Sequence, residues 1–291
     1  MEMIGHSARI AAILLLIVLI MVYPFLPGQY DALAMPLSTV VQLLATVSLL
    51  LVPLGALWLV YELRKRARRN QNLPGTNRGY YFALFSLIAA SLLIILISLF
   101  TFFGVGISLG VLTLVFWFYV FIRLLPGLKL MKKTEPESIN PAPFYLILIP
   151  VVLLLFQLAL APPLTGFSRN YAIAHSAEFN RDIEAYRTAQ GHYPHSLLAT
   201  WKDYYPSIVG IEKFHYTPNG DSYDLFFEQP RFLLDNLGTR EFVVYNPLDE
   251  HMIISHTSWI LLLPPEELQV TQGWYAAHDA ASPHWRYFWF D

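Results

Sequence analysis

Five long apolar segments, almost free of ionisable side chains, occupy the first 162 residues of this chain. An α-helix rises about 1.5 Å per residue, so roughly 20 apolar residues cross a hydrocarbon core about 30 Å thick. We place the candidate spans at Ala8–Leu26, Pro36–Tyr61, Tyr81–Phe103, Val105–Leu124 and Phe144–Ala161. The sequence therefore predicts an all-α membrane bundle of five transmembrane helices, in which a tight turn near Gly104 joins the third and the fourth.

Residues 163–291 differ in composition from residues 1–162 and predict a second, extracytoplasmic domain. This second part carries eight Lys and Arg against sixteen Asp and Glu, whereas the first part carries eleven against five. Nucleic-acid phosphates and anionic lipid headgroups repel a domain of that charge. We therefore expect the partners to be the lipid bilayer and other membrane or periplasmic proteins, and no nucleic acid.

The Lys and Arg side chains between the spans fall on one side of the predicted membrane. Short loops rich in these residues stay in the cytoplasm. One such loop follows the second span and another follows the fourth, whereas residues 27–36 carry only Asp31. Alternating the sides puts the N-terminus in the cytoplasm and residues 163–291 in the periplasm of a bacterial inner membrane.

We interpret the basic residues of these loops as topology determinants that contact anionic lipid headgroups. Binding of a cytoplasmic protein is the alternative. The residues are Arg64, Lys65, Arg66, Arg68, Arg69, Lys132 and Lys133.

The first span imitates a secretory signal peptide, because Arg9 precedes its apolar run and the small residues Ala32-Leu33-Ala34 follow it. The apolar run is long for a signal peptide, and residues 24–30 separate it from the small residues. We therefore expect a retained anchor. Cleavage is the alternative, and it would leave four spans and the same outer domain.

The spans hold few side chains that carry chemistry. Charged and His residues in a bilayer mark ion paths, proton relays or cofactor ligands, and the interiors of the five predicted spans contain none. We therefore expect neither ion-coupled transport nor a cofactor. Pro53 with Gly55, and Pro150, lie inside spans and predict bends that fit the bundle, with a functional hinge as the alternative.

Ser108 lies in a Gly-x-Ser-x-Gly string, Gly106 to Gly110, which is the pattern of a hydrolase nucleophile elbow and is similar to the serine motif of rhomboid proteases. A nucleophilic serine needs a base within hydrogen-bond reach. The one histidine before the outer domain, His6, is predicted on the opposite side of the membrane. We interpret the two glycines as residues that let the fourth span pack closely on the third, and keep Ser108 as a candidate nucleophile for a histidine of the outer domain.

The outer domain is predicted to be α+β, with a long helix on an antiparallel sheet. Pro162-Pro163 is expected to end the fifth span, and an amphipathic helix is expected from Ser168 to Gln190, capped by Gly191. Asn219-Gly220 favours a hairpin turn. The candidate strands are Phe214–Thr217, Ser222–Glu228, Glu241–Tyr245, Met252–Ser255, Trp259–Leu263 and Trp285–Phe290.

Part of this domain, roughly Ala174–Glu228, resembles the globular part of type IV pilins and type II secretion pseudopilins. The resemblance is carried by Tyr186-x4-Gly191-x-Tyr193-Pro194-x-Ser196-Leu197 and by the hairpin from Tyr216 to Phe227. It implies an extracytoplasmic module in which a helix packs on a sheet. Because Pro162-Pro163 is expected to break the continuous helix that a pilin needs as its stalk, we expect no assembly into a filament.

Eight of the nine histidines lie in the outer domain, and a zinc site would need three or four side chains to converge. The candidates are His192 with His195, and His251 with His256. Pro194 separates the first pair, which lacks the helical geometry of zinc hydrolases. We expect ordinarily hydrogen-bonded histidines and no metal. The chain has no Cys, which excludes disulfides, thiolate metal sites and cysteine nucleophiles.

The C-terminal segment is the most aromatic of the chain. Trp285, Tyr287 and Trp289 are candidates for docking a partner or for seating rings in the bilayer interface. We favour a terminal strand that closes the sheet.

No motif identifies a reaction. We expect a non-enzymatic inner-membrane protein that presents an acidic periplasmic domain as a scaffold, an assembly factor or an accessory subunit of an envelope complex. The alternative is a small-molecule or lipid transporter, or a membrane enzyme whose site lies between the outer domain and the start of the fourth helix.

Overall fold

The computed structural model describes residues 2–71, 78–133, 139–200, 202–235, 239–251, 253–254, 262–263 and 275–290. The chain divides into two compact units. The helical unit contains Met1–Met21 and Pro36–Gln157, and the α+β unit contains Val22–Met35 and Leu158–Asp291. The predicted division at residue 162 is near the second boundary, whereas the sequence did not indicate that Val22–Met35 joins the C-terminal part.

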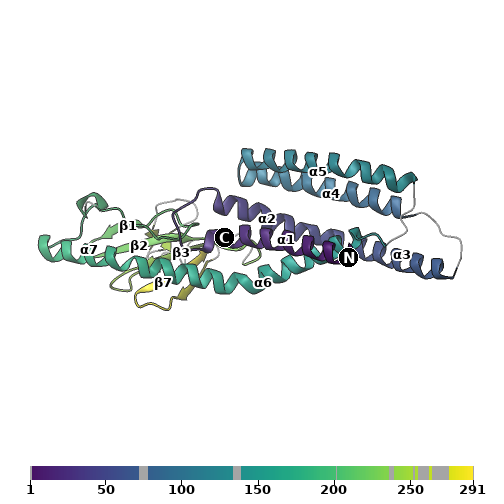
Figure 1. The fold of residues 1–291 in the computed structure, drawn as a ribbon. Coiled ribbons are helices and arrows are strands. Elements are labelled where there is room, and N and C mark those ends of the chain that lie inside the picture. The colour runs from purple at the N-terminus through teal and green to yellow at the C-terminus, as the bar shows by residue number, and fades with distance from the viewer. Residues whose placement is uncertain are drawn as a thin grey trace. The chain divides into compact units, whose positions relative to one another are not determined.

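Within the described residues, five helices are long and apolar enough to cross a membrane, as the sequence predicted. Figure 1 shows them as long ribbons, and the second consists of two helices joined by a 3-10 turn. The elements are α1 (Glu2–Val22), η1 (Tyr23–Phe25), α2 (Ala34–Ser48), η2 (Leu49–Leu51), α3 (Val52–Asn70), α4 (Gly79–Gly104), α5 (Ile107–Lys133) and α6 (Ala142–His175).

Helices α4 and α5 form the tight antiparallel hairpin that the short connector predicted (Figure 1). The amides of Val105 and Gly106 donate to the carbonyl of Thr101 at 3.0 and 2.8 Å, which closes the turn. A Cβ at Gly110 would lie 2.8 to 2.9 Å from Cβ, Cα and N of Phe102. Gly110 therefore allows the close packing predicted for it, whereas a Cβ at Gly106 would meet nothing within 4 Å.

The two prolines expected to bend spans behave differently from each other. At Pro53 the α-helix gives way to the 3-10 turn η2 and restarts as α3, because proline offers no amide to the carbonyl four residues earlier. Gly55, two residues on, faces α6, where an added Cβ would lie 3.0 Å from Leu146 and Ile147. Helix α6 continues through Pro150.

The prediction that Pro162-Pro163 ends the fifth span is wrong, because α6 continues to His175. Both prolines are exposed, and a buried stripe with helical spacing runs past them through Ala161, Thr165 and Ser168. Packing of that stripe outweighs the two lost hydrogen bonds, as tertiary contacts commonly override local propensity. The expected break in a pilin-like stalk is therefore absent from this helix. Helix α7 (Ala177–Gln190) follows after Ser176.

The α+β unit contains a five-stranded antiparallel sheet with the order β1-β2-β3-β7-β6. The strands are β1 (His215–Asn219), β2 (Ser222–Gln229), β3 (Arg240–Tyr245), β6 (Tyr275–Asp279) and β7 (Trp285–Phe290). The C-terminal strand β7 is internal, because β6 pairs with its far edge. The sequence analysis did not predict β6.

Two further predicted strands, Met252–Ser255 and Trp259–Leu263, lie partly outside the described residues. Their described parts form a separate two-stranded ladder, β4 (Ile253–Ile254) with β5 (Leu262–Leu263). The hairpin between β1 and β2 is confirmed, and Gly220 adopts the positive φ of 58° that the turn requires.

Helix α7 and the end of α6 bury one face against this sheet. Phe179 and Ile183 of α7 are fully buried in one core with Tyr223, Leu225 and Phe227 of β2. Gly191 ends α7 with the left-handed φ of 78°. The helix-on-sheet arrangement expected for this domain is therefore present.

The segment Val22–Met35 is a structural part of the α+β unit. The ring of Phe25 stacks on Phe232 at 4.6 Å between centroids. The backbone of this segment also pairs with residues 207–210: the amide of Gly28 donates to Ser207, and the amide of Asp31 donates to Val209, each at 3.0 Å. The connector between the first two apolar helices is thus held by the C-terminal part of the chain.

Candidate functional site

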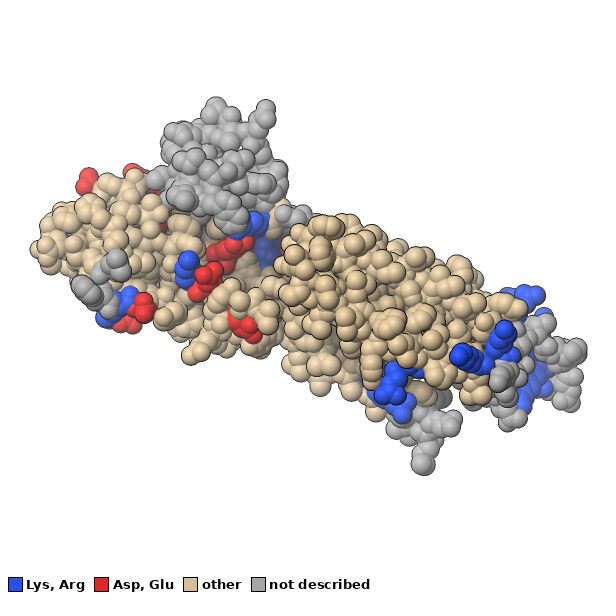
Figure 2. All heavy atoms as spheres, turned by 90° about the horizontal axis from the view of Figure 1, so that it is seen from above, with Lys and Arg blue, Asp and Glu red and all other residues tan. Residues whose placement is uncertain are grey.

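One end of the helical unit gathers most of its basic side chains (Figure 2). Several contacts bring helix ends together there: the amide of Arg78 donates to the Tyr61 hydroxyl at 2.9 Å, and the Lys132 ammonium lies 5.9 Å from the centre of the Tyr80 ring. The middle of α3 therefore contacts the start of α4, and the start of α4 contacts the end of α5.

Five of the basic residues predicted to set topology lie in the last turns of α3, and Lys132 lies at the end of α5. Their side chains are exposed or half-buried, and the side chain of Lys133 lies outside the description. The described side chains of this set gather at one end of the helical unit. This placement does not test what they bind.

Glu62 is a buried acid next to this cluster that the sequence analysis passed over. It is 3% exposed, and its carboxylate accepts hydrogen bonds from Trp58 Nε1 at 3.1 Å and from the Asn140 amide at 3.5 Å. The carboxylate therefore ties α3 to the chain that enters α6. Its signal in the sequence was a single acid just before the basic run Arg64–Arg69.

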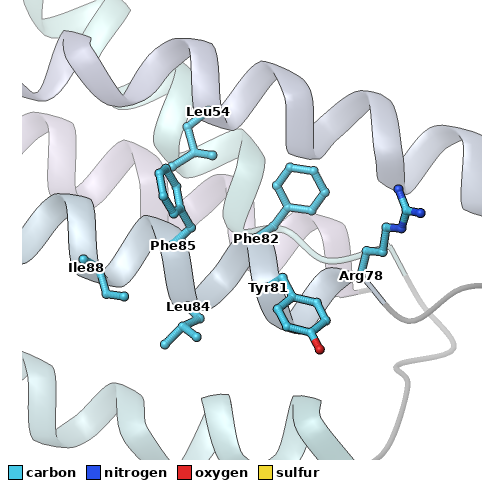
Figure 3. A pocket seen from close by; sticks show the side chains of 7 residues that line it. All are labelled: Leu54, Arg78, Tyr81, Phe82, Leu84, Phe85 and Ile88. Atoms are coloured by element: carbon cyan, nitrogen blue, oxygen red, sulfur yellow. The ribbon is translucent and has the colours of Figure 1, made fainter.

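An apolar cavity of about 520 Å³ lies between α3 and α4. Figure 3 shows Leu54 of α3 and Phe85 of α4 pointing toward one another within its wall. Arg78 contributes the charge, and the remaining lining is aromatic or aliphatic. The lining residues are Leu54, Arg78, Tyr81, Phe82, Leu84, Phe85 and Ile88. Such a wall suits a hydrocarbon chain and carries no nucleophile or acid.

A second cavity, about 280 Å³ in volume, lies in the α+β unit and has a polar wall. Its lining comes from Val22–Met35, from residues 210–215 and from the end of β2. The polar side chains among these residues are Tyr30, Glu212, Lys213, His215, Glu228 and Gln229. Both signs of charge occur, which distinguishes this cavity from the apolar one.

A buried charge cluster joins α6 to the sheet. The carboxylate of Glu241 on β3 is fully buried and accepts from Arg169 Nε at 2.8 Å and from Trp289 Nε1 at 2.7 Å. The guanidinium of Arg169 also lies 3.7 Å from the centre of the Tyr287 ring, and that of Arg231 lies 4.4 Å from the Trp289 ring. These contacts give the aromatic strand β7 a packing role.

The three aromatic residues proposed for docking are thus differently placed. Trp285 is 5% exposed and belongs to the core, whereas Tyr287 and Trp289 are half-buried against the arginines. Whether their exposed edges contact a partner or a bilayer stays a prediction.

Ser108 is exposed in the first turn of α5, and no hydrogen bond of its side chain is found within the part of the chain that the structure describes. His6 hydrogen-bonds through Nδ1 to the Tyr145 hydroxyl at 3.0 Å, so the one histidine of the helical unit has another partner. A catalytic role for Ser108 stays a hypothesis.

The histidines proposed for a metal do not converge where they are described. His192 and His195 stack with ring centres 5.4 Å apart, and His256 lies outside the described residues. His251 is buried, and its two ring nitrogens lie 3.1 and 3.0 Å from the carbonyls of Asp249 and His284. Within the described ranges, no three His, Asp or Glu side chains are arranged to hold a metal ion.

His251 connects two loops in unusual backbone conformations. Asp249 and His284 adopt positive φ angles of 61° and 64°, which L-residues rarely do. Their side chains also meet, with 3.1 Å between His284 Nδ1 and a carboxylate oxygen of Asp249. Burial lowers the pKa of His251. The buried imidazole ring therefore lies between a backbone carbonyl of each loop.

No protein-family model matches this chain, and searches of curated proteins and of solved structures also found no match. The function must therefore be argued from the chain's own residues.

Proposed function

We propose that this protein is a multi-pass protein of a bacterial inner membrane that presents an acidic α+β domain in the periplasm. It acts there as a scaffold, an assembly factor or an accessory subunit of an envelope complex. The pilin-like module is part of the proposal, with helix α7 and the sheet as its helix-on-sheet core.

One observation carries the proposal: the loop after the first apolar helix is hydrogen-bonded to the C-terminal part of the chain. Val22–Met35 follows the first of the five helices, and residues 207–210 follow the fifth. Four further crossings return the chain to the side on which it stood after the first. The contact therefore supports five crossings with the loop and the acidic domain on one side.

The basic cluster supports the orientation. The helix ends that meet at Arg78 and Tyr61 carry most of the positive charge of the helical unit. Positive ends of short loops stay in the cytoplasm, so the acidic domain belongs to the periplasm. The hydrogen bonds of Gly28 and Asp31 also support a retained first helix, because the chain beside Ala32-Leu33-Ala34 is held within a folded unit.

Attachment at three chain connections supports a scaffold rather than a loosely tethered domain. The chain passes between the units after Met21, Met35 and Gln157. Three such connections, rather than one, suit a domain that positions a second protein. The acidic balance of residues 163–291 favours a basic or neutral partner surface.

The test is purification of the full chain from native membranes after chemical cross-linking, with quantitative mass spectrometry. A matched variant replaces three exposed acids of the α+β unit, Asp203→Asn, Asp221→Asn and Glu250→Gln. We expect a stoichiometric partner that the variant retains less well. A second variant, Arg66→Gln with Arg68→Gln, controls for loss of charge and should retain it.

The scaffold proposal would be contradicted if the native protein and both variants all purified without a partner. The apolar cavity between α3 and α4 then makes lipid or small-molecule transport the next candidate, because its lining suits an acyl chain. That candidate predicts co-purified lipid in molar amounts, which Phe85→Asp should displace.

A further inference from the structure

The polar cavity of the α+β unit lies beside the start of an apolar helix. Met35, which lines it, is the second residue of α2, and Tyr30 lies in the connector that leaves the first apolar helix at Phe25. In the membrane arrangement proposed above, on which this inference rests, a residue in the first turn of a span lies at the depth of the lipid headgroups. The cavity therefore opens where headgroups are concentrated.

Charges of both signs lie around this cavity, and they form ion pairs. Lys213 and Glu212 pair at 3.8 Å, and Glu228 on β2 forms a two-pronged ion pair with Arg240 of the neighbouring strand. Each of these acids therefore lies beside a base, and both signs of charge stand in or next to the cavity wall. Paired charges of both signs favour a zwitterion over an anion or a cation, because a zwitterion can exchange partners with such pairs and leave no charge unpaired.

Two further polar groups of the cavity wall, His215 and Tyr30, both lie within electrostatic reach of Glu212. Burial lowers the pKa of His215, with Lys213 adding to the effect, so the ring is neutral near pH 7. Burial raises the pKa of Tyr30, and the nearby carboxylates of Glu212 and Asp31 raise it further, so its hydroxyl keeps its proton. Both groups therefore offer neutral N–H or O–H donors beside the ammonium of Lys213.

We propose that this cavity binds a ligand that joins a phosphate to a primary ammonium group, as the headgroup of phosphatidylethanolamine does. Lys213 and the Tyr30 hydroxyl bind the phosphate, since charged and neutral donors are what a phosphate oxygen accepts. Glu212 and Glu228 accept from the ammonium. At about 280 Å³ the cavity suits a headgroup rather than a larger molecule.

A primary ammonium is favoured over a quaternary one. An ammonium with N–H groups donates hydrogen bonds to carboxylates, whereas a trimethylammonium is recognised by a cage of aromatic faces. Tyr30 and His215 are the aromatic rings among the lining residues, too few for a cage. A phosphatidylglycerol headgroup lacks the ammonium, so a phosphate bound by Lys213 would leave Glu212 without a positive partner.

The test is native mass spectrometry of the full-length protein in detergent, with phosphatidylethanolamine, phosphatidylcholine and phosphatidylglycerol added separately. We expect phosphatidylethanolamine to be retained best. Lys213→Ala and Glu212→Gln, both at exposed positions, should each weaken it about tenfold, the loss expected for one charged hydrogen bond. Lys202→Ala and Glu250→Gln, a lysine and a glutamate outside the cavity, are the matched controls.

Equal retention of the three lipids, or equal loss in the cavity variants and the controls, would overturn the proposal. Soluble phosphoethanolamine separates the two sources of this chemistry. If it binds the delipidated protein as tightly as the lipid does, a free solute is the ligand, whereas weak competition assigns the site to the membrane lipid. Extraction of the protein from membranes by alkaline carbonate would sink the membrane placement together with this inference. A carbonate-resistant protein without lipid selectivity would sink this inference alone.

Discussion

The two units place the same kinds of side chain in opposite positions. Phe116 of α5 is 65% exposed and Leu112 is 59% exposed, whereas Phe227 and Leu225 of the sheet are fully buried. Burying apolar surface away from water drives folding of the α+β unit. In the bilayer proposed for the helical unit, that driving force is missing between helices, because lipid tails are as apolar as leucine. Under this proposal the helical unit relies on close approach at small residues.

The comparison predicts that phenylalanine matters for stability only in the unit that hides it from water. Phe227→Ala should lower the free energy of unfolding of the α+β unit by about 3–5 kcal/mol, the range for removing a buried aromatic ring. Phe116→Ala should change the free energy of unfolding of the helical unit little. Thermal unfolding of the detergent-solubilised protein, followed by tryptophan fluorescence, measures both. Similar losses in the two variants would mean that α5 buries Phe116 against a neighbour.

Within the α+β unit, a buried and an exposed carboxylate differ as sharply. Glu241→Gln removes the carboxylate that holds Arg169 and leaves a buried guanidinium uncompensated, which costs about 3–5 kcal/mol. Asp279→Asn breaks the exposed pair with Arg286 and should cost less than about 1 kcal/mol. The same melting curves compare them. A stable Glu241→Gln variant would show that Arg169 finds another partner or water.

Close approach at glycine is the corresponding weak point of the helical unit. Gly110→Leu places a side chain where Phe102 backbone atoms lie within 2.9 Å, so the α4–α5 hairpin must open. Overpacking of this kind costs about 1–3 kcal/mol. Gly127→Leu, in the same helix but with nothing within 4 Å of the added Cβ, is the control. Equal melting temperatures of the two variants would contradict the close packing.

The smallest effect is expected at His251, and it depends on pH. Because burial lowers its pKa below the unfolded value of 6.5, the unfolded chain binds the proton first as the pH falls. Its contribution is therefore present above about pH 6.5 and is lost as the pH falls toward the lowered pKa. His251→Gln should cost about 1 kcal/mol near pH 8 and flatten the acid-side loss.

Melting curves from pH 8 to pH 5 test this, with the exposed His195→Gln as the control. A steeper loss of stability in acid for the His251 variant than for the native protein would contradict the lowered pKa. Binding of zinc by the native chain with a rise in melting temperature, absent from the variant, would instead favour a metal at this position.

Much of the helical unit followed from single-residue properties. The apolar segments and the Gly104 turn predicted the helices and the hairpin, since hydropathy over about 20 residues is a strong local signal. The Asn219-Gly220 hairpin was equally local. The predictions that failed depend on contacts between segments distant in the chain. Nothing near Pro162 reveals the buried stripe that keeps α6 helical past it.

The candidate sites were less predictable than the fold. Met35 and Glu228 line one cavity although more than half of the chain separates them in sequence. Arg169 and Glu241 pair across 72 positions. Neither residue stands out in its local sequence. Only packing of the sheet against α6 brings the two side chains together.

The sequence by itself determined that the chain has five apolar helices, an acidic second part and a basic cluster between helices, because composition and hydropathy act over short windows. The tertiary structure decided that the connector after the first helix belongs to the C-terminal unit, that α6 continues through two prolines, and that β7 lies inside the sheet. These outcomes depend on the free energy of packing between segments distant in the chain. A local pattern of residues does not encode this packing free energy.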